Sequence, residues 1–169
     1  YDRAMTVAGD EYAVSAFSSS AETKEAKNNI VEKAWKKMNG ICYNGSGEKI
    51  PGAITRGIDV SEWQDIINWK KVKSAGIDFA FVRIAYGLNY MDKTFDYNMK
   101  QAELAGVPVG TYIYSTATSE ETALKEAQLA IKKMKGYKVS YPVVFDMEYS
   151  GASKLSPGKI SKMAHAFCD

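Results

Sequence analysis

Histidine and cysteine are nearly absent from the sequence. His165 is the only histidine among 169 residues, and Cys42 and Cys168 are the only cysteines. One histidine on a late helical stretch argues against Ser-His-Asp and Cys-His mechanisms, because each needs an imidazole beside its nucleophile. The two cysteines form no Cys-x-x-Cys spacing that would indicate a metal site, and they leave open either a disulfide or two free thiols.

Long apolar runs, excess charge and phosphate-binding loops are missing as well. No apolar stretch approaches the roughly 20 residues that cross a bilayer, so we expect no membrane span. The formal net charge is +2 with acids and bases interspersed, which gives no indication of nucleic-acid binding. No predicted strand is followed by a glycine-rich phosphate loop, which disfavours nucleotide-binding folds.

The first fifty residues differ in pattern from the rest. Ser19–Glu22 fits a capping box, and apolar residues then recur every four positions over Ala26–Met38. This spacing predicts an amphipathic helix that ends near Gly40. The glycine-rich segment Tyr43–Gly52 follows and predicts a connector. We therefore predict a helical extension and linker over residues 1–50.

Strand and helix patterns alternate from Arg56 onward. Four apolar segments are typical of buried strands, and each is followed by a helical pattern. The predicted strands are TRGIDVS, IDFAFVRIAYG, VPVGTYIYS and VSYPVVFDME. Short links between alternating elements predict a parallel sheet covered by helices, either an open doubly wound sheet or a closed β/α barrel. Residues 51–169 are thus predicted to form an α/β unit.

Acidic and aromatic residues follow these predicted strands. Asp59 ends the first strand, and Asp146 and Glu148 end the fourth. Residues two apart in a strand share a face and stand roughly 6.5–7 Å apart along it, and the carboxyl ends of parallel strands meet at one edge. Aromatic residues are expected at the same edge, namely Trp63, Tyr86, Tyr112 and Tyr114. Other acids are expected in solvated loops or at helix starts, namely Glu62, Asp65, Asp92 and Asp96.

Carboxylates beside aromatic rings favour carbohydrate over phosphate as a ligand. Aromatic rings cover the apolar faces of sugars, while carboxylates bond hydroxyl groups or transfer protons. Glycoside hydrolysis needs one protonated carboxyl group and a second acid, and two close carboxyl groups do not both ionise easily. An Asp-x-Glu pair also suits turn capping or binding of a hard cation. No second cluster completes a metal site, so we predict neither a metal nor a cofactor.

Four motifs resemble, in this order, glycoside hydrolase family 25, the Chalaropsis-type lysozymes. The motifs are RGIDVSEWQ, AGIDFAFVRIAYG, AGVPVGTYIYSTATS and YPVVFDMEY, and the resemblance covers Arg56 to about Asp169. It implies a modified TIM-like β/α barrel with its site at the carboxyl rim. It also implies a lysozyme that cleaves the β-1,4 bond between N-acetylmuramic acid and N-acetylglucosamine in the glycan strands of peptidoglycan.

The resemblance also implies roles for individual residues. Glu148 corresponds to the proton donor, and Asp59 to the residue that positions substrate and tunes the acids. Asp146 would assist at the anomeric centre, either directly or by steering the 2-acetamido group of the substrate. The family often has a histidine between the two tyrosines of the third strand, where this chain has Ile113. Since Ile113 is expected to face away from Tyr112 and Tyr114, this departure should affect packing more than chemistry.

The length of the chain departs from the family pattern. A complete barrel of this type takes about 200 residues or more, whereas Arg56–Asp169 supplies only four predicted strand–helix units. We expect an N-terminal portion of the barrel here, incomplete at its C-terminus and completed by a missing segment or a further chain. The chain opens on Tyr1 without an apolar leader, so we expect a processed, secreted or cell-wall-associated protein. A non-catalytic sugar-binding module and a metal-dependent polysaccharide deacetylase are the alternatives.

Overall fold

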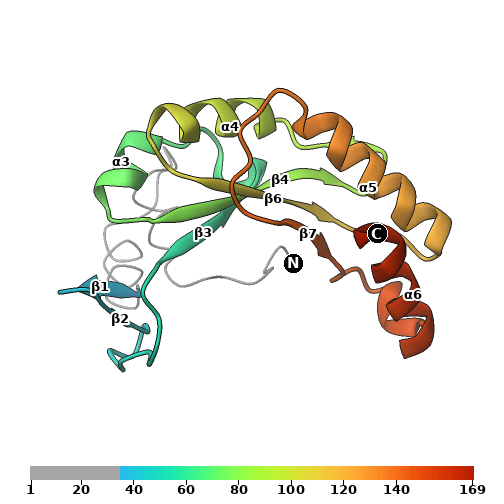
Figure 1. The fold of residues 1–169 in the computed structure, drawn as a ribbon, viewed down its shortest axis with the longest axis horizontal. Helices are drawn as coiled ribbons and strands as arrows, with labels where there is room; N and C mark the ends of the chain where they lie inside the picture. Colours follow the sequence, from blue (N-terminus) through green and yellow to red (C-terminus); the bar gives the residue numbers. More distant parts are fainter. Residues whose placement is uncertain (1–34) are drawn as a thin grey trace.

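The structure, a computed structural model, describes residues 35–169, which form an α/β fold around a mostly parallel sheet (Figure 1). The strands are β1 (Lys36–Met38), β2 (Ile41–Tyr43), β3 (Gly57–Val60), β4 (Phe79–Tyr86), β5 (Tyr90–Met91), β6 (Val109–Tyr114) and β7 (Val143–Asp146). The helices are η1 (Glu62–Gln64), α3 (Trp69–Ser74), α4 (Phe95–Leu104), α5 (Glu120–Met134), η2 (Ala152–Lys154) and α6 (Pro157–Cys168), where η marks a 3₁₀ turn.

The central sheet has the strand order β3-β4-β6-β7, and all neighbours on this path are parallel. A helix follows each of these strands before the next one begins. The short strand β5 turns back and pairs antiparallel with the end of β4. The predicted parallel sheet with covering helices is therefore confirmed, and the carboxyl ends of four strands lie at one edge.

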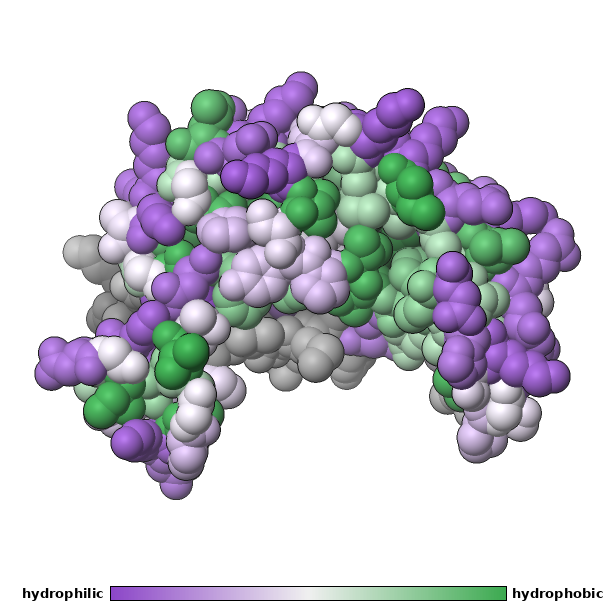
Figure 2. Space-filling model, viewed as in Figure 1, coloured by the Kyte–Doolittle hydropathy of each residue, from purple (hydrophilic) through white to green (hydrophobic). Residues whose placement is uncertain are grey.

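The helices cover one face of the sheet. Val82 and Ile84 of β4 and Ile113 of β6 are buried in the larger apolar core, together with Val72 of α3 and Met99 of α4. Figure 1 shows α3, α4 and α5 lying over this face, and Figure 2 shows many hydrophilic side chains along their outer side. Ile113 thus faces away from the neighbouring tyrosines, as predicted, because side chains alternate along a strand.

A second apolar cluster attaches the end of the chain to the sheet. Phe145 of β7 stacks on Phe167 of α6 with ring centroids 4.5 Å apart. Ala123 and Ala127 of α5 and Met163 of α6 are buried in the same cluster. The last strand and helix are therefore held by packing on the same face as α5.

The other face of the sheet carries Asp59 and Asp146, and we call it the acid face. Asp59 is aligned with Phe81, which shares this face. The rings of Phe79, Phe81 and Tyr141 pack together here, with the centroids of Phe79 and Tyr141 4.8 Å apart. These rings are close-packed against the backbone of two glycines, Gly57 and Gly110, whose missing Cβ atoms would overlap Phe79 and Phe81.

The predicted helix through Met38 is wrong at its C-terminal end. Lys36–Met38 and Ile41–Tyr43 pair as an antiparallel hairpin, with Met38 opposite Ile41. Asn39 and Gly40 form the turn with φ of 51° and 76°. An Asn-Gly pair with two positive φ values is the preferred two-residue hairpin turn, and it overrides the four-residue apolar spacing. The rest of that helix prediction lies outside the described residues.

The hairpin is tied to the sheet by charged groups. The ammonium of Lys37 donates to the Asp78 carboxylate at 2.9 Å, and the same Asp78 oxygen accepts from the backbone N–H of Arg56 at 2.8 Å.

Both cysteines are free thiols, with Cys42 buried and Cys168 exposed. Within residues 35–169, no helix has the length and apolar character needed to traverse a bilayer.

We predict that Gly110→Ala destabilises the protein by about 1–3 kcal/mol, as overpacking of a well-filled interior does. The added Cβ would overlap the Phe81 ring and lie 2.7 Å from the Pro142 carbonyl oxygen. Urea unfolding followed by circular dichroism measures the change. Gly158→Ala is the matched control, because a Cβ on this α6 glycine meets no atom within 4 Å. Equal stability of the two variants would contradict the close packing on the acid face.

Candidate active site

The three predicted acids lie at the carboxyl end of the sheet. Asp59 is in β3, and Asp146 is the last residue of β7, aligned with Tyr114 of β6. Met147 packs in the apolar cluster beneath α5 and α6. Because side chains alternate along β7, Asp146 is directed to the acid face, and Glu148 follows two residues later, beyond the end of the strand. Asp59 shares that face but stands on the opposite edge strand, three strand spacings of about 4.8 Å away along the sheet.

Three of the four predicted aromatic residues lie together near this edge. Tyr86 at the end of β4 stacks on Tyr114 with ring centroids 4.8 Å apart and an interplanar angle of 14°. Trp63 in η1 is 68% exposed and Tyr86 is 40% exposed, so both rings offer surface to a ligand. Tyr112 is only 6% exposed. Its ring is buried and offers little surface to a ligand.

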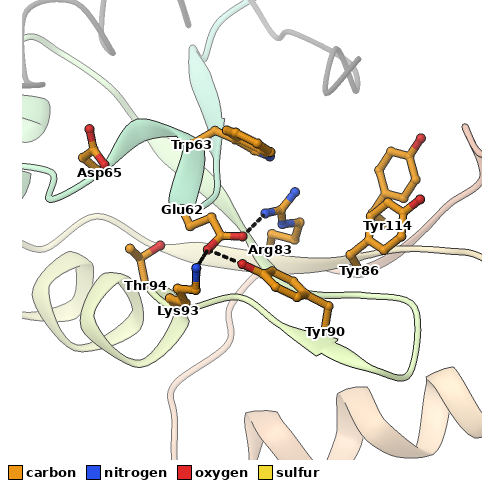
Figure 3. A pocket seen from close by; sticks show the side chains of 9 residues that line it. All are labelled: Glu62, Trp63, Asp65, Arg83, Tyr86, Tyr90, Lys93, Thr94 and Tyr114. Carbon is orange, nitrogen blue, oxygen red and sulfur yellow. Dashed lines mark hydrogen bonds and ion pairs between the residues drawn. The ribbon is translucent and has the colours of Figure 1, made fainter. Parts of the chain in front are cut away.

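A pocket of about 760 Å³ opens beside these rings (Figure 3). Its walls come from η1, the ends of β4 and β6, and the segment around β5. The lining residues are Glu62, Trp63, Asp65, Arg83, Tyr86, Tyr90, Lys93, Thr94 and Tyr114. Trp63, Tyr86 and Tyr114 therefore line one cavity, while the three acids are not part of its lining.

A buried ionic network forms the floor of the pocket. Arg83 is 2% exposed, and its Nε donates to Asp92 at 2.9 Å. Its Nη2 donates to Glu62 Oε1 at 3.2 Å. The other oxygen of Glu62 accepts from the Tyr90 hydroxyl at 2.9 Å, and the Lys93 ammonium lies 3.6 Å from it. The carboxylates of Asp92 and Glu62 thus compensate the positive charge of the buried Arg83.

The network continues into the helix-covered core. The second oxygen of Asp92 accepts from the N–H and hydroxyl of Thr94 at 2.9 and 2.8 Å. Asn98 donates to the Thr94 hydroxyl at 3.0 Å, and its own carbonyl accepts from the Trp69 indole at 3.0 Å. A chain of polar contacts therefore runs from the core to the pocket.

The sequence did not predict this network. Glu62 and Asp92 were expected in solvated loops or at helix starts; Glu62 does begin η1, but Asp92 is 6% exposed and binds Arg83. An arginine inside the apolar run FAFVRIAYG was the available signal, because arginine is almost never fully buried unless it is paired. Asp65 and Asp96 are exposed, as expected.

A buried carboxylate supports the turn that follows β6. Glu126 of α5 has no exposed surface, and one of its oxygens accepts from the Thr116 N–H at 3.1 Å. Ser115 in this turn donates its N–H to the Asp146 carbonyl at 2.7 Å. Burial raises the pKa of Glu126, and hydrogen bonds from Ser115, Thr116 and the Ala117 N–H oppose that shift. Glu126 therefore braces the loop that contacts the end of β7.

Within residues 35–169, no three His, Cys, Asp or Glu side chains are grouped so that they could hold a metal ion. Exposed rings and carboxylates at the carboxyl edge of a parallel sheet are instead typical of a carbohydrate-binding or carbohydrate-cleaving protein. The sequence model of the family described as "Glycosyl hydrolases family 25" matches residues 58–169, which is most of the chain. The protein belongs to glycoside hydrolase family 25.

Individual relatives agree with this assignment. Lysozyme M1 of Streptomyces globisporus is 47% identical over 60 residues, which cover 36% of this chain and 20% of that protein. The uncharacterised protein YegX of Escherichia coli K12 is 32% identical over 120 residues, which cover 68% of this chain and 43% of that protein.

Solved structures show the same fold. The modular autolysin LytC of Streptococcus pneumoniae aligns with a TM-score of 0.64 and 28% identity, over 79% of this chain and 34% of that one. The bacterial lysozyme of Streptomyces coelicolor aligns with a TM-score of 0.54 and 28% identity, over 69% of this chain and 56% of that one. The chain thus spans less than two thirds of the length of these relatives.

We predict that Glu126→Gln flattens the pH dependence of stability. A carboxyl group whose pKa is raised by folding binds protons more tightly in the folded state. The parent therefore loses unfolding free energy as the pH rises from about 4, the usual range of glutamate, through the raised pKa. The Gln variant lacks this loss, so its stability relative to the parent increases with pH. Urea unfolding at a series of pH values measures the difference.

Glu103→Gln is the control for this measurement, because Glu103 is an exposed glutamate at the end of α4. We expect this variant to follow the parent at every pH. A constant difference between the Glu126→Gln variant and the parent across the pH series would contradict the assignment of the raised pKa to Glu126.

Proposed function

We propose that the protein is a peptidoglycan hydrolase, an endo-N-acetylmuramidase that cleaves the β-1,4 bond between N-acetylmuramic acid and N-acetylglucosamine. One observation carries this proposal. In a chain that belongs to family 25, Asp146 ends β7 in register with Tyr114, whose ring stacks on that of Tyr86, and Glu148 follows two residues later. Lysozyme M1, an autolysin and a bacterial lysozyme among the relatives support the same activity.

The proposed mechanism uses the two neighbouring acids in different roles. Glu148 donates a proton to the leaving sugar oxygen. Asp146 either attacks the anomeric carbon or orients the 2-acetamido group of the substrate to attack it, as the bond to the leaving sugar breaks. Water, deprotonated by Glu148, then attacks the same carbon and completes the hydrolysis. Adjacent carboxyl groups resist double ionisation, which leaves one proton available for transfer. Asp59, on the other edge strand, positions the substrate across the same face.

The architecture that we propose is a modified TIM-like β/α barrel. The four parallel strands would form its N-terminal portion, with the acid face turned toward the barrel interior and the remaining strands supplied by a further segment or chain. Support comes from family 25 structures that are longer than this chain. The alignment with this chain covers 34–56% of their length. The site then lies at the carboxyl rim, the usual place of active sites in such barrels.

The proposed partner is the glycan strand of peptidoglycan, and the proposed location is extracellular or at the cell wall. One structure of LytC was determined in complex with a synthetic peptidoglycan ligand, and this chain aligns with it at a TM-score of 0.64. The exposed rings of Trp63 and Tyr86 are suited to cover the apolar faces of successive sugars.

Purified cell walls incubated with the full-length protein test this function against its rivals. New reducing ends identify a glycosidase, released acetate identifies a deacetylase, and wall binding without either product identifies a sugar-binding module. We predict new reducing ends with a muramic acid terminus.

We predict that Glu148→Gln lowers the turnover number by about 10²–10⁴-fold, the usual contribution of a general acid. Wall binding in a pull-down assay should stay within about twofold, because the amide keeps the size of the side chain. Glu103→Gln again serves as control, since its side chain lies on the exposed surface of α4. Undiminished turnover in the Glu148→Gln variant would remove this residue from the role of acid.

A further inference from the structure

The turn η1 carries Trp63 into the pocket without an apolar anchor of its own. It is a single 3₁₀ turn of three residues, and none of its residues is buried in the core. A capping box between Ser61 and Gln64 closes the turn locally. Trp63 itself is 68% exposed, so packing does not fix the position of its ring. Something else must attach this turn to the sheet.

Glu62 provides that attachment. Its backbone N–H donates to Asp92 at 2.9 Å, and its carboxylate accepts from Arg83 at 3.2 Å and from the Tyr90 hydroxyl at 2.9 Å. The Lys93 ammonium lies 3.6 Å from the same carboxylate. One residue therefore connects η1 to β4, to β5 and to the segment that leads into α4.

The contacts to Arg83 and Asp92 are strong because water is excluded from them. The side chains of Arg83, Asp92 and Glu62 are 2%, 0% and 14% exposed. A charge pair removed from water is costly to break, since the remaining partner is left uncompensated. The outer part of the network is different, because the Lys93 side chain is 75% exposed. The inner part holds η1 in place, and the outer part lines the pocket.

Tyr90 depends on the same carboxylate. Its strand β5 has only two residues, and the Tyr90 ring is 40% exposed. Figure 3 shows the Glu62 carboxylate and the Arg83 guanidinium between the rings of Trp63 and Tyr90. The two rings form two sides of the pocket, while Tyr86 and Tyr114 form a third.

We propose that Glu62 is a positioning residue that fixes Trp63 and Tyr90 as sugar-binding walls of this pocket. The proposal rests on the proposed function, because it assigns to this pocket a sugar unit beside the cleaved bond. Rings held in place before the ligand arrives lose less conformational entropy on binding, which favours affinity. Since the three acids do not line this pocket, Glu62 acts on substrate affinity and not on the bond-breaking step.

The Glu62→Gln variant separates affinity from chemistry. We expect KM for soluble peptidoglycan fragments to rise about tenfold while kcat stays within about twofold, the pattern of a lost binding interaction. Tyr90→Phe removes only the hydroxyl that Glu62 binds and should raise KM by less. The double variant should resemble Glu62→Gln alone, because the two changes act through one contact. Glu103→Gln is the control.

The position of Trp63 provides a readout that does not need turnover. Subtracting the signal of a Trp63→Phe variant isolates the fluorescence of Trp63 from that of the other two tryptophans. We expect the anisotropy of Trp63 to fall in Glu62→Gln and in Tyr90→Phe, because the ring gains mobility, and to stay unchanged in the control.

Two results would overturn the proposal. A lower kcat with unchanged KM would place Glu62 in the chemical step. Unchanged Trp63 anisotropy in both variants would show that Glu62 does not fix the position of the Trp63 ring. If the parent protein releases no reducing ends from walls, the proposed function fails by itself. The anisotropy and a pull-down with purified walls then still decide whether Glu62 positions the rings for sugar binding.

Discussion

Parallel pairing of β3, β4, β6 and β7 is the constraint on which the rest of the structure depends. Parallel neighbours bring all four carboxyl ends to one edge, and the alternation of side chains divides each strand between two faces. Ile113 therefore enters the helix-covered core while Tyr114 faces the other way, beside Asp146. The same rule sends Phe145 beneath α6 and leaves Asp146 on the acid face. The candidate site follows from pairing and alternation together.

The acid face and the pocket meet competing demands. Sugar binding needs exposed rings and polar groups, whereas folding favours apolar burial. The structure separates the two along the strands: the half-buried rings of Phe79, Phe81 and Tyr141 pack on one another on the acid face, and Tyr86 and Trp63 are exposed at the carboxyl edge. Between them, Arg83 is a cation buried among aromatic and apolar residues. It is tolerated because Asp92 and Glu62 compensate its charge and accept its hydrogen bonds.

The two ends of the site are supported differently. On the β7 side, the loop after β6 is supported by the buried carboxylate of Glu126 and is joined to Asp146 through its backbone. On the β3 side, the support is the Arg83 network, which reaches from Trp69 in the core to Glu62 at the pocket. Both supports are buried polar groups, and such groups specify one arrangement only when their partners are all in place. The rings that face the ligand depend on them, because exposed side chains have little packing of their own.

Local patterns in the sequence were sufficient for the four parallel strands. Apolar runs joined by short links predicted the segments that contain β6 and β7. The strand-end residues Asp59, Asp146 and Glu148 were predicted at the carboxyl edge for the same reason. The hairpin at Asn39-Gly40 was not predicted, because the apolar residues around this local turn signal also fit the four-residue spacing of a helix. Of the four aromatic residues expected at this edge, Trp63, Tyr86 and Tyr114 line one pocket, and Tyr112 is not among its lining residues.

By itself, the sequence determined which residues end the strands and which face of each strand they occupy, since both follow from short-range periodicity. Only the tertiary structure decided the partners of Arg83, because Glu62 and Asp92 lie 21 and 9 residues away along the chain and meet it through strand pairing and a turn of β5. The burial of individual acidic side chains was also decided only by the tertiary structure. Asp92 and Glu126 resemble exposed acids in the sequence, and only the packing of helices over the sheet removes them from water. Long-range contacts of this kind have no local pattern, because the residues that form them are selected by the fold.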